Sequence, residues 1–247
     1  MAAHLKIEGE MARARFLSRT SRFSVLAELE DARSGSGNFE CHLPNPGRLK
    51  ELLLRPAKNS ERRKTKFDVF AVVTGAGTVV VDSRIPNQIV GEALNSGDIP
   101  HFSGYKLVRS EPAYGKSRLD FLLAGDKLWL VEVKSCTLVK DGIALFPDAP
   151  TERGCRHLRE LARAVEDGYW ACVVFIIQRE DAELFVPNDE TDPAFGDALR
   201  VAAAGGVEVI ALATQYRTGK VELIGEVPID LRKARPIPPF ERNAPAR

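Results

Sequence analysis

The segment 116–136 constrains the fold more than any other part of this 247-residue chain. It contains two strand-like runs joined by the polar residues 124–127, which predicts a β-hairpin with a tight turn. Because side chains alternate between the two faces of a strand, pairing about Asp126 puts Phe121 opposite Val131 on a wholly apolar face. A shift of one residue mixes the polar and apolar sets, so the pattern selects this register.

The other face of the predicted hairpin pairs Asp120 with Glu132 and carries Lys134 two residues further on. Like charges directly across a strand pair are destabilising, so two facing carboxylates need a physical reason. A divalent cation between their oxygens is one, since hard cations take carboxylate ligands. The alternative is a solvated face on which Lys134 and Arg118 neutralise the acids. An Asp on one strand and Glu-x-Lys on the next resembles the signature of the PD-(D/E)XK nuclease superfamily.

Three further residues lie in elements that can approach this pair. Glu92 falls in a predicted helix over 86–95 and is a candidate third carboxylate. Arg153 and His157 are four residues apart in a predicted helix over 151–167, so they share a face and can reach a scissile phosphate. Two of them also have a plain structural interpretation: Glu92 as a surface acid of the helix, and His157 as a capping or core-edge residue.

Basic residues are concentrated in the first third of the chain, although the total of 35 Lys and Arg nearly balances 34 Asp and Glu. The loop 48–66 is the most basic part, and its charges can bind the phosphate backbone of a nucleic acid. The alternative is a solvated basic loop without a partner. The side chains that we assign to DNA contact are Arg48, Lys50, Arg62, Arg63, Lys64, Lys66, Lys116, Arg118, Arg153 and His157.

The pattern of predicted elements changes near residue 84. Before it, about five short strands punctuated by glycine suit a small barrel such as an OB-fold, and an SH3-like barrel fits nearly as well. After it, helices alternate with strands, and the apolar run 169–178 is typical of a strand buried on both faces. We therefore predict an α+β fold with a barrel over 1–84, an α/β domain with a mixed central sheet over 85–231, and a basic, Pro-rich mobile tail over 232–247.

Several kinds of site and partner are disfavoured. The four cysteines form no C-x-x-C motif, which argues against a zinc site or a disulfide framework. No apolar run is long enough to cross a bilayer, and the N-terminus lacks the apolar core of a signal peptide, so we expect a cytoplasmic protein with no membrane partner. The glycine runs at 75–77 and 115–117 match neither a dinucleotide fingerprint nor a P-loop, so we expect no dinucleotide cofactor. A homo-oligomer is left open.

Long motifs carry a resemblance to a known family. They are CHLPNPGRL (41–49), GKSRLDFLL (115–123), VEVKSCTL (131–138), FPDAPTERGCRHLREL (146–161) and GVEVIA (206–211). From about residue 10 to 231 the chain resembles the bacterial sugar fermentation stimulation protein family. The resemblance implies an OB-like domain, a PD-(D/E)XK nuclease-like domain, DNA binding and a regulatory part in sugar (maltose) metabolism. The resemblance implies directly that Asp120, Glu132 and Lys134 are site residues, because their motifs are intact in this sequence. It implies the same for Glu92 less directly.

Three functions are open at this point. The first is hydrolysis of DNA with Mg²⁺ or Mn²⁺, in which Asp120 and Glu132, with Glu92, hold the metal. Lys134 then orients the attacking water or neutralises the developing charge. The second is a non-catalytic DNA-binding regulator of sugar (maltose) metabolism genes that retains a nuclease scaffold. The third is a small-molecule or protein-interaction module without a nucleic-acid role.

Overall fold

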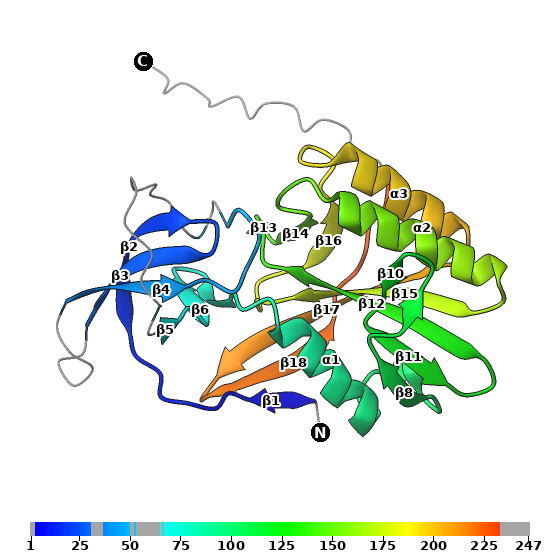
Figure 1. Ribbon diagram of the computed structural model, residues 1–247, viewed down its shortest axis with the longest axis horizontal. Helices are drawn as coiled ribbons and strands as arrows, with labels where there is room; N and C mark the ends of the chain where they lie inside the picture. The colour runs from blue at the N-terminus through cyan, green and yellow to red at the C-terminus, as the bar shows by residue number, and fades with distance from the viewer. Residues whose placement is uncertain (1–2, 31–36, 50–51, 53–64, 66, 233–247) are drawn as a thin grey trace, which may run out of the picture.

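The centre of the protein is a seven-stranded mixed sheet with the order β1-β18-β17-β15-β12-β11-β8 (Figure 1). We describe it from a computed structural model, which covers residues 3–30, 37–49, 52, 65 and 67–232. The middle strands, β12 (Leu128–Cys136), β15 (Trp170–Ile177) and β17 (Glu208–Arg217), are parallel to one another. The flanking strands are antiparallel to their neighbours: β11 (Phe121–Ala124), β8 (Lys106–Ser110), β18 (Lys220–Glu226) and β1 (His4–Lys6).

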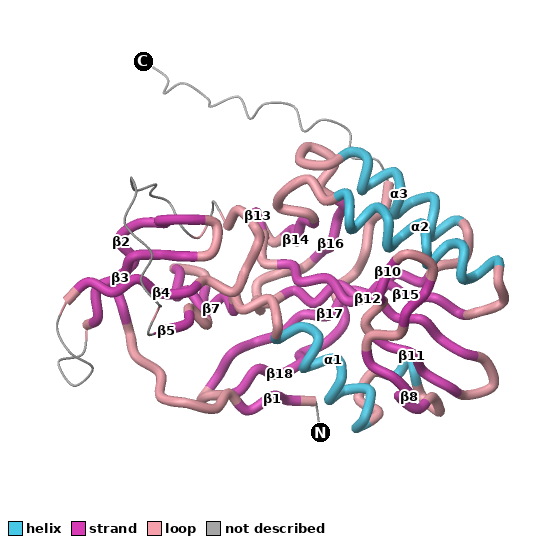
Figure 2. Tube along the Cα trace, viewed as in Figure 1, coloured by secondary structure: helices cyan, strands magenta, loops and turns pink. Residues whose placement is uncertain are grey.

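Helices cover both faces of this sheet (Figure 2). Helix α1 (Ile85–Ser96) packs on one face, while α2 (Glu152–Glu166) and α3 (Pro193–Ala204) lie side by side on the other. Residues Ala171 to Ile177 of β15 are all buried, as the unbroken apolar run predicts for a strand between two helical layers. The predicted helices and strands of this part agree with those observed to within a few residues.

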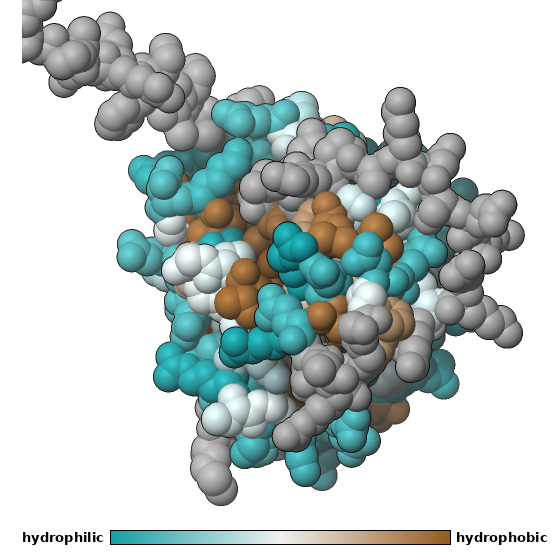
Figure 3. Space-filling view, turned by 90° about the vertical axis from the view of Figure 1, so that its left-hand side faces the viewer, coloured by the Kyte–Doolittle hydropathy of each residue, from teal (hydrophilic) through white to brown (hydrophobic). Residues whose placement is uncertain are grey.

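The N-terminal part is a second, smaller assembly of strands. One sheet has the order β2-β3-β4-β5, and β6 and β7 form a separate hairpin. The strands are β2 (Ala14–Ser21), β3 (Ser24–Leu29), β4 (Asn38–His42), β5 (Phe67–Asp68), β6 (Ala71–Thr74) and β7 (Gly77–Val80). They enclose a core that includes Val25, Leu43, Leu49 and Val81. On the outer face of this assembly, hydrophobic residues gather near the centre and hydrophilic residues surround them (Figure 3).

Several short elements of the larger part lie outside the seven-stranded sheet. A three-stranded sheet has the order β13 (Val139–Lys140), β14 (Ile143–Phe146) and β16 (Leu184–Pro187). A small hairpin joins β9 (Ala113–Tyr114) to β10 (Ser117–Arg118), and a 3-10 turn, η2, spans Pro100–Phe102.

The N-terminal strand belongs to the large sheet and not to the small one. In β1, Leu5 pairs with Val221 of β18, so the first residues of the predicted barrel over 1–84 lie at the edge of the other assembly. The division of the chain near residue 84 otherwise stays a prediction. The tail 233–247 and most of the basic loop lie outside the described residues. Among the described helices, none is long and apolar enough to span a membrane.

Candidate active site

The predicted hairpin register is confirmed from Phe121, which pairs with Val131, to the turn at 125–127. The ladder stops at Phe121, and Asp120 lies just outside it. Its backbone N–H donates to the Val131 carbonyl at 3.0 Å, and its carboxylate Oδ2 accepts the Val133 N–H at 2.7 Å. The Asp120 side chain thus accepts a hydrogen bond from the backbone of β12. The predicted ladder pairing of Asp120 with Glu132, and those of the residues before it, are therefore wrong.

Asp120 is held by neutral hydrogen-bond donors. Its Oδ1 accepts a hydrogen bond from Asn87 Nδ2 of α1 at 2.5 Å, in addition to the Val133 N–H at Oδ2. Burial raises the pKa of Asp120 to about 6, and the negative charge of Glu132 adds to the rise, while the two hydrogen bonds oppose it. The structure therefore holds Asp120 as a carboxyl of unusually weak acidity with two fixed oxygens.

Glu132 is held by a cation and an imidazole. Its side chain is 4% exposed, and Oε1 contacts both Lys134 Nζ, at 2.5 Å, and His157 Nδ1. Burial alone would raise the pKa of Glu132, but the His157 hydrogen bond and the Lys134 charge outweigh it and leave the pKa below its ordinary value. The second oxygen, Oε2, is buried and has no hydrogen-bond partner among the described residues. Glu132 thus keeps one carboxylate oxygen for a further ligand.

Helix α2 brings Arg153 and His157 to this carboxylate. The helix begins after Thr151, whose Oγ1 accepts the Gly154 N–H at 3.0 Å as an N-cap. Arg153 Nε donates to His157 Nε2 at 3.3 Å, so Nε2 is an acceptor and the imidazole proton lies on Nδ1, facing Glu132. The predicted shared face is confirmed. However, His157 is buried, so it supports Glu132 and does not offer a surface for DNA, contrary to our prediction.

Glu92 does not join the pair. It is exposed on α1, and no described hydrogen bond or ion pair links it to Asp120 or Glu132. Five residues on an α-helix amount to about 140° of rotation, so Asn87 and Glu92 cannot point to the same place. Asn87 is the α1 residue that contacts the site, and the sequence did not single it out because an amide side chain carries no metal-ligand signature.

The remaining predicted residues lie around the site or beyond the described chain. Arg118 is exposed and pairs with Glu111 at 3.4 Å. Lys116 is exposed, and its backbone N–H donates to Glu160. Arg48 is exposed, and its carbonyl accepts a hydrogen bond from Arg19. Outside the described residues lie Lys50, Arg62, Arg63, Lys64 and Lys66.

The donor set fits a hard divalent cation. Glu132 offers a buried oxygen without a partner, and Asp120 is a carboxylate whose ionised form would gain from a nearby positive charge. Within the described ranges, no group of three or more His, Cys, Asp or Glu side chains is arranged to hold a metal. The protein ligands would therefore be these two carboxylates, with backbone carbonyls or water completing the shell.

Comparison with known proteins identifies the family. Residues 17–81 match the SfsA N-terminal OB domain, and residues 84–220 match the sugar fermentation stimulation protein RE domain. A sugar fermentation stimulation protein homolog of Moorella thermoacetica is 45% identical, covering 92% of this chain and 100% of that protein. The homolog of Symbiobacterium thermophilum is 43% identical, covering 90% and 95%.

A solved structure agrees with these matches. The structure of Pyrococcus furiosus SfsA in complex with Ca²⁺ superposes with a TM-score of 0.82 at 26% identity, covering 93% of this chain and 99% of that one. The predicted α+β fold, an OB domain followed by a nuclease-like domain with a mixed sheet, is confirmed, and the SH3-like alternative is set aside. The chain belongs to the sugar fermentation stimulation protein family.

Proposed function

We propose that this protein binds DNA and hydrolyses a phosphodiester bond in it with Mg²⁺ or Mn²⁺. One observation carries the proposal: Asp120 and Glu132 come from neighbouring segments beside the Lys134 ammonium, and Glu132 keeps a buried oxygen without a partner. Desolvated acids next to a fixed cation are typical of active sites, where such environments tune acidity.

The two carboxylates would hold the metal. The similar Pyrococcus furiosus protein was solved in complex with Ca²⁺, a hard cation that takes the same kind of oxygen ligands. A bound Mg²⁺ or Mn²⁺ supplies Lewis acidity, which polarises a phosphoryl oxygen and lowers the pKa of a water. Asn87 and the Val133 N–H fix the orientation of Asp120, while His157 and Lys134 fix that of Glu132.

Lys134 is the residue that we assign to charge stabilisation. Its side chain is only 12% exposed and its ammonium is held 2.5 Å from Glu132 Oε1, so its position is set before any substrate binds. A preorganised cation next to the reacting phosphate lowers the energy of the charge that develops in the transition state.

The assignment is tested by nicking of supercoiled plasmid in Mg²⁺ or Mn²⁺, with DNA affinity measured separately in EDTA. We expect Lys134→Ala to lower the cleavage rate by about 100-fold or more, as loss of one preorganised charge does in other enzymes. DNA affinity should stay within about tenfold, or 1.4 kcal/mol. The matched control is Lys140→Ala, which removes an exposed lysine of β13. Equal cleavage by Lys134→Ala and the wild type would refute the role.

A second candidate is a non-catalytic DNA-binding regulator of sugar (maltose) metabolism genes. The observation that favours it is the occupation of Glu132 Oε1 by Lys134 and His157, which leaves that carboxylate fewer free positions for a metal. This candidate expects DNA affinity that falls steeply with salt. It also expects no nicking by the wild type at concentrations where binding is complete, so the same assay separates the two.

A further inference from the structure

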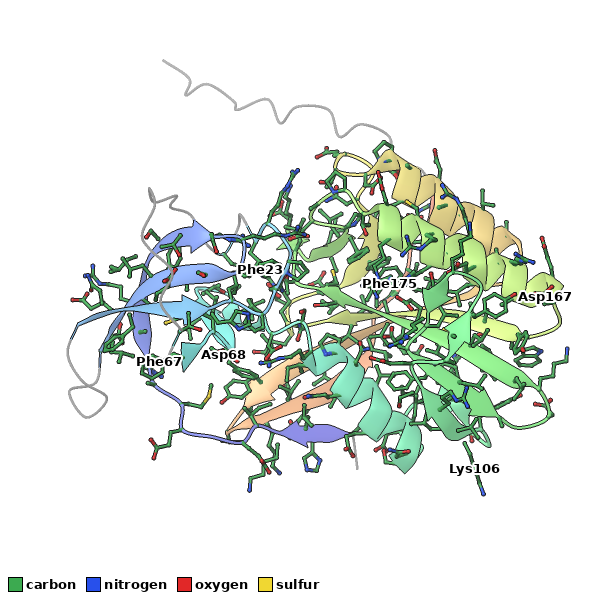
Figure 4. The ribbon with its side chains drawn as sticks, viewed as in Figure 1. Phe23, Phe67, Asp68, Lys106, Asp167 and Phe175 are labelled. Carbon is green, nitrogen blue, oxygen red and sulfur yellow. The ribbon has the colours of Figure 1, made fainter. Side chains whose placement is uncertain are left out.

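The turn between β2 and β3 presents an aromatic ring to solvent. Phe23, in the turn between β2 and β3, is 46% exposed. The guanidinium of Arg22 lies over this ring, 5.5 Å from its centroid. Figure 4 shows Phe23 at the end of the small sheet that is nearest to the large one. An exposed aromatic ring beside an arginine offers a stacking surface with a positive charge.

A cleft of about 240 Å³ adjoins this turn. Arg22 and the segment 45–47 line one side, and the segments 135–138 and 145–151 line the other. Ser135 and Cys136 lie at the end of β12, and Thr151 is the N-cap of α2. The cleft is therefore bordered by the turn of the small sheet and by the ends of the two elements that carry Glu132, Lys134 and His157.

Hydrogen bonds hold both sides of the cleft in place. Arg22 Nε donates to the Pro46 carbonyl at 3.2 Å, and Arg19 Nη2 donates to the Gly47 carbonyl at 2.9 Å. Across the cleft, Asp148 Oδ2 accepts the Leu49 N–H at 3.2 Å. A Cβ at Gly47 would lie 2.5 Å from that same oxygen, so only glycine permits this approach. The cleft is built before any ligand arrives, which lowers the entropic cost of binding.

The chemistry of the cleft suits a nucleobase. Leu138, Phe146 and Pro147 give it apolar walls, and Thr137 and Asp148 add polar groups. The Ser135 hydroxyl accepts a hydrogen bond from the buried Gln178 amide at 3.0 Å, which leaves its own proton to donate to a ligand. Apolar faces with a few fixed polar groups are how proteins bind a base that has left its stack.

We propose that the Arg22–Phe23 turn and this cleft form a subsite for one unpaired nucleotide of a DNA strand whose phosphodiester lies at Lys134. The unpaired base enters the cleft, Phe23 stacks on the face of the neighbouring base that the unpaired base leaves exposed, and Arg22 faces the phosphate between the two. The inference rests on the proposed function, because it names the substrate class of the same site: DNA with an unpaired nucleotide, rather than a continuous duplex.

The test is fluorescence anisotropy in EDTA with two labelled DNAs, a duplex that carries one unpaired central nucleotide and the same duplex fully paired. We expect the wild type to bind the first about tenfold more tightly. Phe23→Ala should remove this preference by weakening binding of the first DNA about tenfold, the loss expected for one aromatic stack. Binding of the paired duplex should stay within about twofold.

Matched variants separate stacking from other effects. Phe23→Tyr keeps the aromatic face and should keep the preference, whereas Phe23→Leu keeps apolar bulk and should lose it. Val73→Ala removes an exposed apolar side chain from the same small assembly, and should leave the preference unchanged. Thermal unfolding of each variant establishes that it is folded, and Phe23→Leu replaces Phe23→Ala if the latter is not.

The outcomes distinguish this inference from the proposed function. A wild type that binds both DNAs equally, or a Phe23→Ala protein that keeps its preference, overturns the nucleotide subsite and leaves DNA binding intact. Equal weakening of both DNAs by Phe23→Ala also overturns it, since the ring would then act on the duplex in general. A wild type that binds neither DNA at low salt overturns the proposed function itself.

Discussion

The two sides of the central sheet each hold one carboxylate of the site, and they hold it in opposite ways. On the α1 side, Asp120 has only neutral donors and its pKa is raised to about 6. On the α2 side, Glu132 has Lys134 and His157, and its pKa is lowered. The two acids thus differ in acidity because Lys134 and His157 contact Glu132 directly, whereas the Lys134 charge acts on Asp120 only weakly and burial prevails there. Divergent acidity of neighbouring carboxylates is a common way to give them different roles.

The variant with the largest expected effect on stability removes the His157 imidazole on the α2 side. His157→Ala leaves the buried Glu132 with one hydrogen-bond donor fewer, and we expect the free energy of unfolding to fall by about 3 kcal/mol, because a buried carboxylate then lacks a partner. Urea denaturation at pH 7 measures this. The matched control is His101→Ala, because His101 pairs with Glu208 at the surface, where both side chains are about 40% exposed. That variant should lose less than about 1 kcal/mol. Equal losses would show that burial does not distinguish the pairs.

The next test concerns the α1 side and its pH dependence. Since the pKa of Asp120 is about 6 in the folded protein and near 3.8 in the unfolded chain, the folded state holds a proton that the unfolded state has lost between these values. The contribution of Asp120 to stability therefore falls as the pH rises through this window. Glu132 has the opposite sign, because its lowered pKa contributes stability at higher pH that is lost as the pH falls.

Asp120→Asn isolates the first of these two effects. In EDTA, the stability of the variant relative to the wild type should be greater at pH 7 than at pH 4.5 by about 2 kcal/mol, at 1.36 kcal/mol per pKa unit. Urea unfolding at the two pH values gives this difference. Addition of Mg²⁺ at pH 7 should stabilise the wild type and not the variant. A difference that does not change with pH would mean that Asp120 is not a weak acid in the folded protein.

The variant with the smallest expected effect removes one hydrogen-bond donor from Asp120. Asn87→Ala should raise the pKa of Asp120 further, by about one unit, since a hydrogen bond to a charged group contributes about 1.5 kcal/mol. An NMR titration of the Asp120 carboxyl carbon measures the change. Gln88→Ala, which alters the exposed neighbour of Asn87 on α1, is the control and should leave the titration unchanged. An unaltered midpoint in Asn87→Ala would separate Asn87 from the site.

Features set by local alternation were predictable from the sequence. The pairing of Phe121 with Val131 follows from side-chain alternation, and α2 follows from its apolar spacing and N-cap. The end of the ladder at Phe121 was not predictable, because it depends on the Asp120 carboxylate taking a backbone N–H. Residue types alone do not show which hydrogen bond an acid makes.

Features that depend on how a helix or turn is rotated or packed could not be predicted from the sequence. Glu92 and Asn87 both lie on α1, and only the packing of Val90 and Ile89 on the sheet decides which one faces Asp120. Phe23 is apolar, as core residues are, but it lies in a turn outside the small core and is exposed. In both cases the deciding contact joins residues far apart in the chain.

The pairing of β1 with β18 has a mechanical consequence. The chain starts in the large sheet, passes through the small assembly from β2 to β7, and returns to the large one at α1, so the small assembly is attached at two points. The ring of Phe70 also packs on Tyr216, with centroids 5.1 Å apart. Together with the Asp148–Leu49 hydrogen bond, these links join the two assemblies at several separate points. Moving the assemblies apart would break the contacts at all of these points, so we expect the small assembly to behave as a rigid extension of the large sheet.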